Sequence, residues 1–333
     1  MSSSNNTPQV AESAWHFVRE VMGGDATLTQ VAGDASFRRY FRVDSSRGRS
    51  ILMDAPPEKE DSAPFLDIAR FLRSHGIPAP EVLADRLEQG YLLLEDFGDL
   101  TYLKALESGA SAEVLYRAAV ETLATLQATP EDGACIAHRR PFDRAMLRRE
   151  LALFTDWYVE GICKRPITLE DRSAFDGVFD RLLDGILVQP WTLVHRDYHS
   201  RNLMWRDGQV GVLDFQDAVM GPITYDLASL LRDCYVAWDA PFRERVMGWW
   251  FADPRIQARY GVDWSTFRRD LEWMGIQRNL KAIGIFGRLS LRDGKHGYLN
   301  DIPRTLGYVR ETLPAHPELT ELAGLIDRYA ARA

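Results

Sequence analysis

The sequence predicts an α+β protein with two lobes, a small and mostly antiparallel sheet lobe followed by a larger, mostly helical lobe. Up to residue 95, short apolar runs alternate with turns rich in glycine, serine and proline, which is typical of strands. From residue 99 onward, apolar residues recur about every 3.6 positions, the spacing of amphipathic helices. We therefore expect a disordered tail over 1–9, a first lobe over 10–95 and a second lobe over 96–333.

The first lobe should begin with a helix, because Trp15, Val18 and Met22 share one helical face before a Gly-Gly pair stops it. Short strands separated by turn residues follow, with one further helix between the third strand and the fourth. The expected helix covers 62–74, and the expected strands cover 27–31, 36–43, 50–53, 82–84 and 90–95.

The second lobe should be built from long amphipathic helices, which we expect over 99–128, 142–163 and 169–187. A strand-rich patch over 191–215 interrupts this helical pattern. Beyond the patch the pattern is helical again, with breaks near Asp239, Asp253 and Pro303.

The composition argues against several kinds of partner. The net charge of −8 disfavours nucleic acid, because phosphate binding needs a basic face. Cys135, Cys163 and Cys234 lie far apart without a CxxC pair, so neither a disulfide framework nor a zinc ribbon is expected. The polar start is no signal peptide, and no apolar run is long enough to span a membrane. We expect a cytoplasmic protein, and nothing in the sequence indicates an obligate protein partner.

The stretch "LVHRDYHSRN", residues 193–202, places several chemically active side chains behind an apolar run. His195 and His199 are four residues apart, the spacing that puts two zinc ligands on one helix face. Metalloproteases, however, carry Glu directly after the first His, whereas this chain has Arg196. The pair also directly follows a strand-like run and does not lie inside a helix, so the zinc interpretation is disfavoured.

A hairpin is predicted directly after this stretch, because two strand-like runs flank Asp207-Gly208, the pair that favours a type I′ turn. In the usual register Asn202 stands opposite Leu213, and Asp214 lies beside Asn202. An amide and a carboxylate oxygen thereby meet at the mouth of the hairpin, and such ligands suit Mg²⁺ shared with substrate phosphates. Asp197 is left free to face an attacking hydroxyl.

His195-Arg-Asp197 with Asn202 matches the catalytic loop of the protein-kinase-like fold, and Leu213-Asp214-Phe215 resembles its metal-binding turn. Together with Tyr225-Asp226-Leu-Ala, these stretches resemble the aminoglycoside phosphotransferase family of small-molecule kinases, and the two-lobe pattern extends the resemblance over nearly the whole chain. The competing interpretation is a polar turn between two helices.

The resemblance implies roles for the central residues. Asp197 would be the catalytic base that orients the acceptor hydroxyl, and Asn202 and Asp214 would bind Mg²⁺. His195 would brace the loop. Asp226 is either a plain N-cap of the following helix or, as in the family, a support for the catalytic loop. ATP and Mg²⁺ are the implied cofactors.

The resemblance also implies nucleotide contacts in the first lobe. Glu95-Asp-Phe97-Gly98 would be the hinge whose backbone pairs with adenine, although an ordinary acidic linker fits equally well. The turn with Gly33, Asp34 and Ser36 would cover the nucleotide phosphates, or is simply a hairpin turn.

One family feature is missing from the chain. Met53 occupies the place on the third strand where the family carries a lysine that reaches the phosphates. Either another cation substitutes, with Lys59, Arg38, Arg39 and Arg42 as candidates, or phosphate binding relies more on Mg²⁺. We prefer substitution and name Lys59.

The acceptor is predicted to be a small molecule, since only residues 215–224 separate Asp214 from the next helix and no Ala-Pro-Glu follows. The tract from Leu271 to Arg310 is locally basic, carrying Arg278, Lys281, Arg288, Arg292, Lys295, Arg304 and Arg310. A solvated helix face is the plain explanation of these charges. A cluster of cations also suits an acceptor with a carboxylate.

Residues 274–289 and Gly221-Pro-Ile-Thr-Tyr-Asp226 resemble the branch of the family that phosphorylates the anomeric hydroxyl of N-acetylmuramate and N-acetylglucosamine in peptidoglycan recycling. N-Acetylmuramate carries a lactyl carboxylate, which fits the basic tract. The implied sugar contacts, each of which also fits a structural role, are His199, Arg201, Asp217, Arg278, Lys281 and Arg288. The alternatives are an aminoglycoside, choline or homoserine kinase, or a nucleotide-binding pseudokinase that scaffolds a partner.

Overall fold

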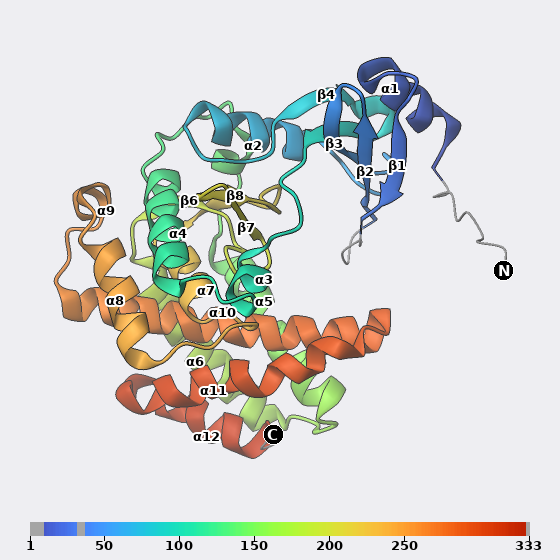
Figure 1. Ribbon diagram of the computed structural model, residues 1–333. Helices are drawn as coiled ribbons and strands as arrows, with labels where there is room; N and C mark the ends of the chain where they lie inside the picture. The colour runs from blue at the N-terminus through green and yellow to red at the C-terminus, as the bar shows by residue number, and fades with distance from the viewer. Residues whose placement is uncertain (1–9, 32–36, 331–333) are drawn as a thin grey trace.

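The computed structural model describes residues 10–31 and 37–330, which form two lobes (Figure 1). The first lobe is a five-stranded antiparallel sheet with strand order β1-β2-β3-β5-β4. Its strands are β1 (Thr27–Gln30), β2 (Arg39–Ser45), β3 (Gly48–Asp54), β4 (Val82–Arg86) and β5 (Tyr91–Glu95). Its helices are α1 (Glu12–Met22) and α2 (Ala63–Ser74), and the short turn η1 (Leu87–Gln89) precedes β5.

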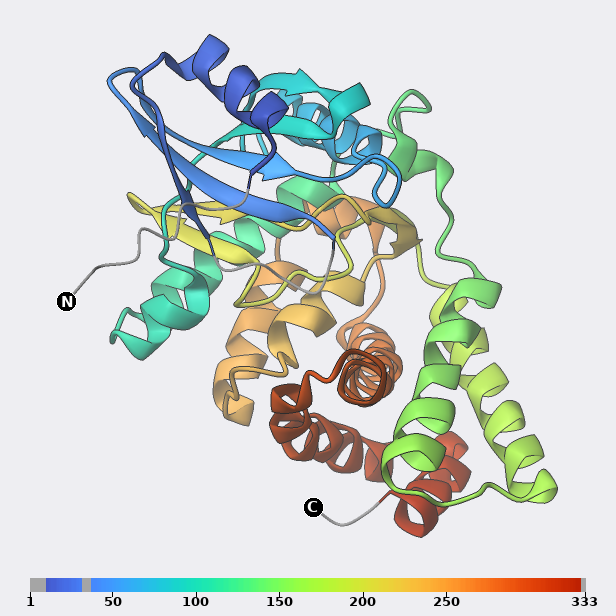
Figure 2. The same cartoon turned by 90° about the vertical axis from the view of Figure 1, so that its right-hand side faces the viewer.

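The two helices of the first lobe cover opposite faces of the sheet, as successive residues of β5 show. Tyr91 and Leu93 belong to the apolar cluster that α1 closes, and Leu92 and Leu94 belong to the cluster that contains α2. This division follows from the two-residue period of a strand. The α2 cluster continues into the second lobe, so the larger core joins the two lobes, and Figure 2 shows α1 on the outer face of the sheet.

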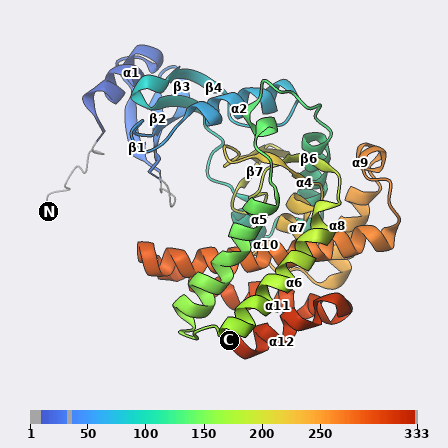
Figure 3. The same cartoon turned by 180° about the vertical axis from the view of Figure 1, so that it is seen from behind.

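The second lobe is helical and is organised around α10 (Trp264–Asp293), which crosses it from side to side (Figure 1). Helices α5, α6, α7 and α11 all contact α10. Figure 3, which views the molecule from behind, shows α5 and α6 crossing α10. The α-helices of this lobe besides α10 are α3 (Tyr102–Glu107), α4 (Ala112–Gln127), α5 (Arg144–Leu153), α6 (Leu169–Leu187), α7 (Tyr225–Leu231), α8 (Ala240–Phe251), α9 (Pro254–Arg259), α11 (Ile302–Thr312) and α12 (Thr320–Tyr329). The short 3₁₀ helices are η2 (Ile136–Arg139), η4 (His296–Asp301), η5 (Leu313–Ala315) and η6 (Pro317–Leu319), and η3 (Phe154–Ile162) is a π-helix.

Two strand pairs lie between the sheet lobe and the helices. β6 (Trp191–Val194) pairs with β9 (Val219–Pro222), and β7 (Leu203–Arg206) pairs with β8 (Gln209–Val212). Arg206 stands opposite Gln209, and Asp207 and Gly208 have φ values of +50° and +82°, which is the predicted type I′ turn. The patch between the lobes therefore holds the candidate site.

The fold class is confirmed, two local predictions need correction, and one strand was not predicted. The predicted helix over 99–128 is two helices, because Gly109 has a φ of +87° and Ser111 caps α4 by accepting from the Val114 amide (3.4 Å). The predicted helix over 142–163 changes to a π-helix at Phe154. Strand β9 was not predicted, since its Gly-Pro ending is typical of a turn. No helix in the described ranges is long and apolar enough to cross a membrane.

Candidate active site

The candidate catalytic loop begins where β6 ends, and a buried carboxylate holds its first turn. Asp226 is 0% exposed, and its two oxygens accept hydrogen bonds from the backbone amides of His195 (2.7 Å) and Arg196 (2.9 Å). Arg196 has a φ of +78°, so these bonds fix a turn that residues other than glycine rarely adopt. Thr224 occupies the N-cap position of α7, so the N-cap interpretation of Asp226 is wrong.

Both ring nitrogens of His195 are engaged inside the loop. Nε2 donates to the carbonyl of Leu213 (2.8 Å), and Nδ1 accepts from the amide of Asp197 (3.2 Å). Neither nitrogen is left for a metal ion, so the zinc interpretation of the His pair does not hold. Across residues 10–31 and 37–330, no three His, Cys, Asp or Glu side chains are grouped as a metal site. His195 instead ties the loop to the end of β8.

The β7–β8 hairpin brings Asn202 and Asp214 together as its predicted register requires. The amide of Leu213 donates to the carbonyl of Asn202 (2.9 Å), and Asn202 Nδ2 lies 3.3 Å from Asp214 Oδ2. Asn202 Nδ2 also donates to the backbone oxygen of Asp197 (3.0 Å). The amide oxygen of Asn202 and the exposed carboxylate of Asp214 are two hard donors in one place. Such a small oxygen set fits Mg²⁺ whose other ligands are phosphate oxygens and water.

Asp197 lies among positive charges. Burial disfavours its charged form, but the charge of Lys281, with a further contribution from Arg278, outweighs burial and holds the pKa of the Asp197 carboxyl well below its usual range. Burial lowers the pKa of His199 to about 4, so this neighbouring imidazole is neutral at physiological pH. Asp197 is therefore an ionised carboxylate at neutral pH.

The sequence analysis missed Glu150, which neutralises part of this charge. Glu150 is 6% exposed on α5 and forms ion pairs with Arg196 (2.7 Å) and Lys281 (3.3 Å). Lys281 also donates to the hydroxyl of Tyr225 (2.9 Å), so its ammonium group is engaged. An acidic residue between apolar neighbours on the buried face of a helix is the sequence signal that could have identified Glu150.

Arg278 differs from Lys281, because it forms no ion pair with a carboxylate of the described residues. It is 4% exposed on α10, and its guanidinium makes one long hydrogen bond, from Nη1 to the Sγ of Cys234 (4.0 Å). No ion pair to Arg278 is formed within the described part of the chain, and its Nε has no hydrogen-bond partner there. A buried charge ordinarily has a partner, so Arg278 is positioned to receive an anion beside Asp197.

A second carboxylate that the sequence analysis missed holds the far end of the loop. Asp233 is fully buried and accepts from the amides of Ser200 (2.9 Å) and Tyr235 (2.8 Å). The Tyr235 ring then supports Arg201, whose guanidinium lies 3.6 Å from the ring centroid and 5.8 Å from that of Tyr298. An exposed cation is thus held over two tyrosines at the edge of the loop.

The remaining predicted sugar contacts are not all at the loop. The ring of His199 packs edge-on against Tyr235, with 5.4 Å between centroids. Asp217 is exposed in the turn that follows Asp214. Arg288 lies on α10 seven residues beyond Lys281, which is about 10 Å farther along the helix. The basic tract is therefore not one surface.

At the junction of the lobes, Glu95 is held by contacts on several sides. Its carboxylate pairs with Arg73 (3.1 Å) and Arg206 (2.6 Å), and its amide donates to the Glu81 carbonyl (2.8 Å). Glu95 and Phe97 line a cavity of about 320 Å³ whose other wall includes the tip of the β7–β8 hairpin. The Glu95 amide is therefore already engaged within the protein.

Each arginine proposed to replace the missing lysine is paired with carboxylates. Arg38 pairs with Glu60 (3.3 Å), Arg39 with Asp54 (2.5 Å), and Arg42 with Asp96 (2.6 Å) and Asp99 (2.9 Å). Lys59 is exposed, and its Nζ lies 4.8 Å from the ring centroid of Phe37. Met53 is fully buried in the core between the sheet and α2. Gly33, Asp34 and Ser36 lie outside the described residues.

The model of the phosphotransferase enzyme family matches residues 27–260, which include the whole loop, the hairpin and all five strands of the sheet. The chain belongs to this phosphotransferase family. Proteins named N-acetylmuramate/N-acetylglucosamine kinase are similar to it over nearly their full length. The one from Pseudomonas putida is 40% identical over 326 residues, which are 97% of this chain and 92% of that protein. The one from Neisseria meningitidis serogroup B is 40% identical over 307 residues, 91% of this chain and 90% of that protein.

Solved structures of other phosphotransferases share the fold at low sequence identity. An ADP-bound aminoglycoside phosphotransferase is 14% identical with a TM-score of 0.61, covering 90% of this chain and 98% of that one. A Plasmodium vivax ethanolamine kinase is 10% identical with a TM-score of 0.65, covering 88% and 85%. The prediction of a protein-kinase-like enzyme is therefore confirmed.

Proposed function

We propose that this phosphotransferase transfers the γ-phosphoryl group of ATP to the anomeric hydroxyl of N-acetylmuramate and N-acetylglucosamine, in cytoplasmic recycling of peptidoglycan. The names of relatives that are 40% identical over most of the chain support the amino sugars as acceptors. The observation that carries the choice of an acidic sugar is Arg278, a buried guanidinium beside Asp197 with no carboxylate partner in the described ranges.

In this proposal the protein acts by positioning and by charge. Asp197 accepts a hydrogen bond from the attacking hydroxyl and receives its proton as the phosphoryl group transfers. Asn202 and Asp214 would hold Mg²⁺, and the ion, when bound, neutralises charge on the phosphates. His195 and Asp226 keep the loop in one conformation, so little reorganisation accompanies the reaction.

The nucleotide contacts are proposed for two segments and one cation. The backbone that follows Glu95, near Phe97, would pair with adenine, and Gly33, Asp34 and Ser36 would cover the phosphates. Lys59 would supply the positive charge that Met53 does not, since it is exposed and its Nζ lies 4.8 Å from the ring centroid of Phe37.

Replacing Lys59 by alanine should raise the KM for ATP roughly ten-fold, about the value of one charge-assisted hydrogen bond, and leave the sugar KM unchanged. Arg38→Ala is the matched comparison, because Arg38 lies in the same region but already pairs with Glu60. Initial rates at varied ATP concentration give the ATP KM of each variant, and the KM of Arg38→Ala should change less than that of Lys59→Ala. An unchanged ATP KM in Lys59→Ala would remove Lys59 from the nucleotide site.

The sugar contacts divide by their surroundings. Arg278 would bind the lactyl carboxylate. Lys281 would contribute through its charge without direct contact, since Glu150 and Tyr225 already engage its ammonium group. His199, Arg201 and Asp217 flank the loop and would contact hydroxyl or acetamido groups, and Arg288 would contact only the far end of a larger acceptor.

The carboxylate contact makes a quantitative prediction. N-Acetylmuramate should have a lower KM than N-acetylglucosamine, and Arg278→Met should raise the first KM by roughly 10- to 100-fold while changing the second little. Arg288→Met, on the same helix and partly buried, is the control and should leave the ratio of the two KM values unchanged. Equal KM values in the wild type, or parallel changes in the variant, would contradict the contact.

A panel of acceptors tests the function itself. With ATP and Mg²⁺, phosphorylation should be found with N-acetylmuramate and N-acetylglucosamine and be far weaker with glucose, choline and kanamycin. Phosphorylation of kanamycin or choline alone would replace the proposal with another kinase of the family. Nucleotide binding without transfer to any acceptor would favour a pseudokinase.

A further inference from the structure

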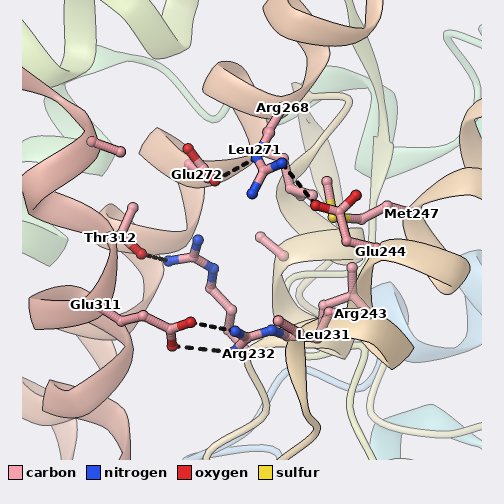
Figure 4. A pocket seen from close by; sticks show the side chains of 13 residues that line it. Leu231, Arg232, Arg243, Glu244, Met247, Arg268, Leu271, Glu272, Glu311 and Thr312 are labelled. Atoms are coloured by element: carbon pink, nitrogen blue, oxygen red, sulfur yellow. Dashed lines mark hydrogen bonds and ion pairs between the residues drawn. The ribbon is translucent and has the colours of Figure 1, made fainter.

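A second cavity lies in the helical lobe, away from the candidate active site. It has a volume of about 190 Å³ and lies among α7, α8, α10 and α11. None of the residues that line it is among the charged groups around Asp197. Figure 4 shows that charged side chains from all four segments point into it, namely Arg232, Arg243, Glu244, Arg268, Glu272 and Glu311.

Every carboxylate of this cavity already has a cationic partner. Glu311 pairs with Arg243, and Arg268 pairs with both Glu244 (2.7 Å) and Glu272 (3.1 Å). Glu272 also contacts the imidazole of His316 (2.8 Å). Two of the three arginines are thereby bound to acids, and these pairs form the walls of the cavity.

The third arginine, Arg232, forms no ion pair within the described residues, although the carboxylates of Glu272 and Glu311 lie near enough to favour its charge. Its guanidinium donates a hydrogen bond from Nη1 to the hydroxyl of Thr312 (2.7 Å), at the edge of the cavity (Figure 4). Burial lowers the pKa of Arg232 to about 10, so the group remains charged at neutral pH. A partly buried guanidinium whose hydrogen bond goes to a neutral hydroxyl leaves donors for an anion.

The backbone around Arg232 is arranged so that this side chain reaches the cavity. Gly275 on α10 lies directly beneath it, and a Cβ atom at that position would come within 2.6 Å of the Cδ and Nε atoms of Arg232. The carbonyl of Arg232 accepts from Asn279 Nδ2 (3.2 Å), which fixes the end of α7 against α10. The guanidinium is therefore held in place and is not a mobile surface group.

We propose that this cavity is a binding site for a small phosphate- or carboxylate-bearing metabolite, held by Arg232 and Thr312. The site is formed in part by the end of α7, and the two carboxylates that hold the catalytic loop lie in α7 and just beyond it. Arg232 directly precedes Asp233, which holds Ser200, and α7 carries Asp226 at its other end. A ligand bound to Arg232 would thus be only a few residues along the chain from Asp233 and Asp226, the two carboxylates that fix the loop. The assignment does not depend on which sugar is the acceptor.

The test measures anion binding to the full-length protein by isothermal titration calorimetry, with inorganic phosphate in one arm and succinate in the other. A non-hydrolysable ATP analogue and Mg²⁺ are present throughout, so that the nucleotide phosphates already occupy their own site. We expect millimolar binding of at least one anion, and the tighter of the two identifies the chemical class.

Arg232→Met should weaken this binding roughly ten-fold or more, and Thr312→Val, a nearly isosteric change, should weaken it to a smaller extent. Arg278→Met is the matched control, because it removes the other unpaired guanidinium and should retain the binding. Anion binding that is lost in Arg278→Met but kept in Arg232→Met would overturn the proposal, as would the absence of binding in the wild type. Thr312→Val decides the matter if Arg232→Met does not fold.

Discussion

Replacing Asp197 by asparagine is expected to lower kcat by roughly 10³-fold or more, while ATP and the sugar still bind. Asparagine has the same shape, but its amide cannot accept the proton of the attacking hydroxyl. In the wild type this carboxyl is ionised, because the charges of Lys281 and Arg278 hold its pKa well below the usual range. Initial rates with saturating substrates measure kcat, and calorimetric titration measures binding.

Asp207→Asn is the matched control for this substitution. Asp207 lies at the tip of the β7–β8 hairpin with 93% of its side chain exposed, and Asn-Gly favours the same type I′ turn. Its kcat should equal that of the wild type. If Asp197→Asn retained more than roughly a tenth of the wild-type kcat, Asp197 would not be the catalytic base.

The second large effect is expected for Asp226→Asn, because both carboxylate oxygens accept from backbone amides. An asparagine side chain turns a donor toward one of these amides, which leaves a buried N–H without an acceptor. We expect kcat to fall about 10²-fold as the loop loses its geometry, whereas the free energy of unfolding should change little, because removing a buried charge offsets the lost acceptor. Asp239→Asn is the control, because asparagine also serves as an N-cap for α8, and it should change neither quantity much.

The carboxyl of Asp226 should make kcat and protein stability respond to pH in opposite directions. Burial raises the pKa of Asp226 to about 6, above its ordinary value of about 4. Protonation below about pH 6 removes one acceptor from the loop, so kcat should fall there. The stability that this raised pKa contributes is fully present below about pH 4 and is lost as the pH rises through about 6. The acid loss of activity should therefore occur without a loss of stability from this group, and it should be absent in Asp226→Asn.

The parts of the site that could be predicted from sequence are those fixed by local geometry. The Asp-Gly turn determines the register of the hairpin, and the register places Asp214 beside Asn202. The breaks in the helices could not be found from apolar spacing alone, since Gly109 interrupts a pattern that continues on both sides.

The missed residues all act through contacts between segments distant in the chain. Glu150 meets Arg196 across 46 positions, and Asp233 meets Ser200 across 33. Charge counting found the basic tract of α10 but could not tell Lys281, which Glu150 neutralises, from Arg278, which has no carboxylate partner in the described part of the chain. Only the tertiary structure separates the two, and this difference decides which residue is proposed to bind the acceptor.

The most direct test of the central claim is the ³¹P NMR spectrum of the product formed from N-acetylmuramate, ATP and Mg²⁺. We predict a sugar phosphate whose phosphorus couples to the anomeric proton, formed in equal amount with ADP and absent when Asp197 is replaced by asparagine. A phosphomonoester at any other hydroxyl, or ADP formed without a sugar phosphate, would contradict the account.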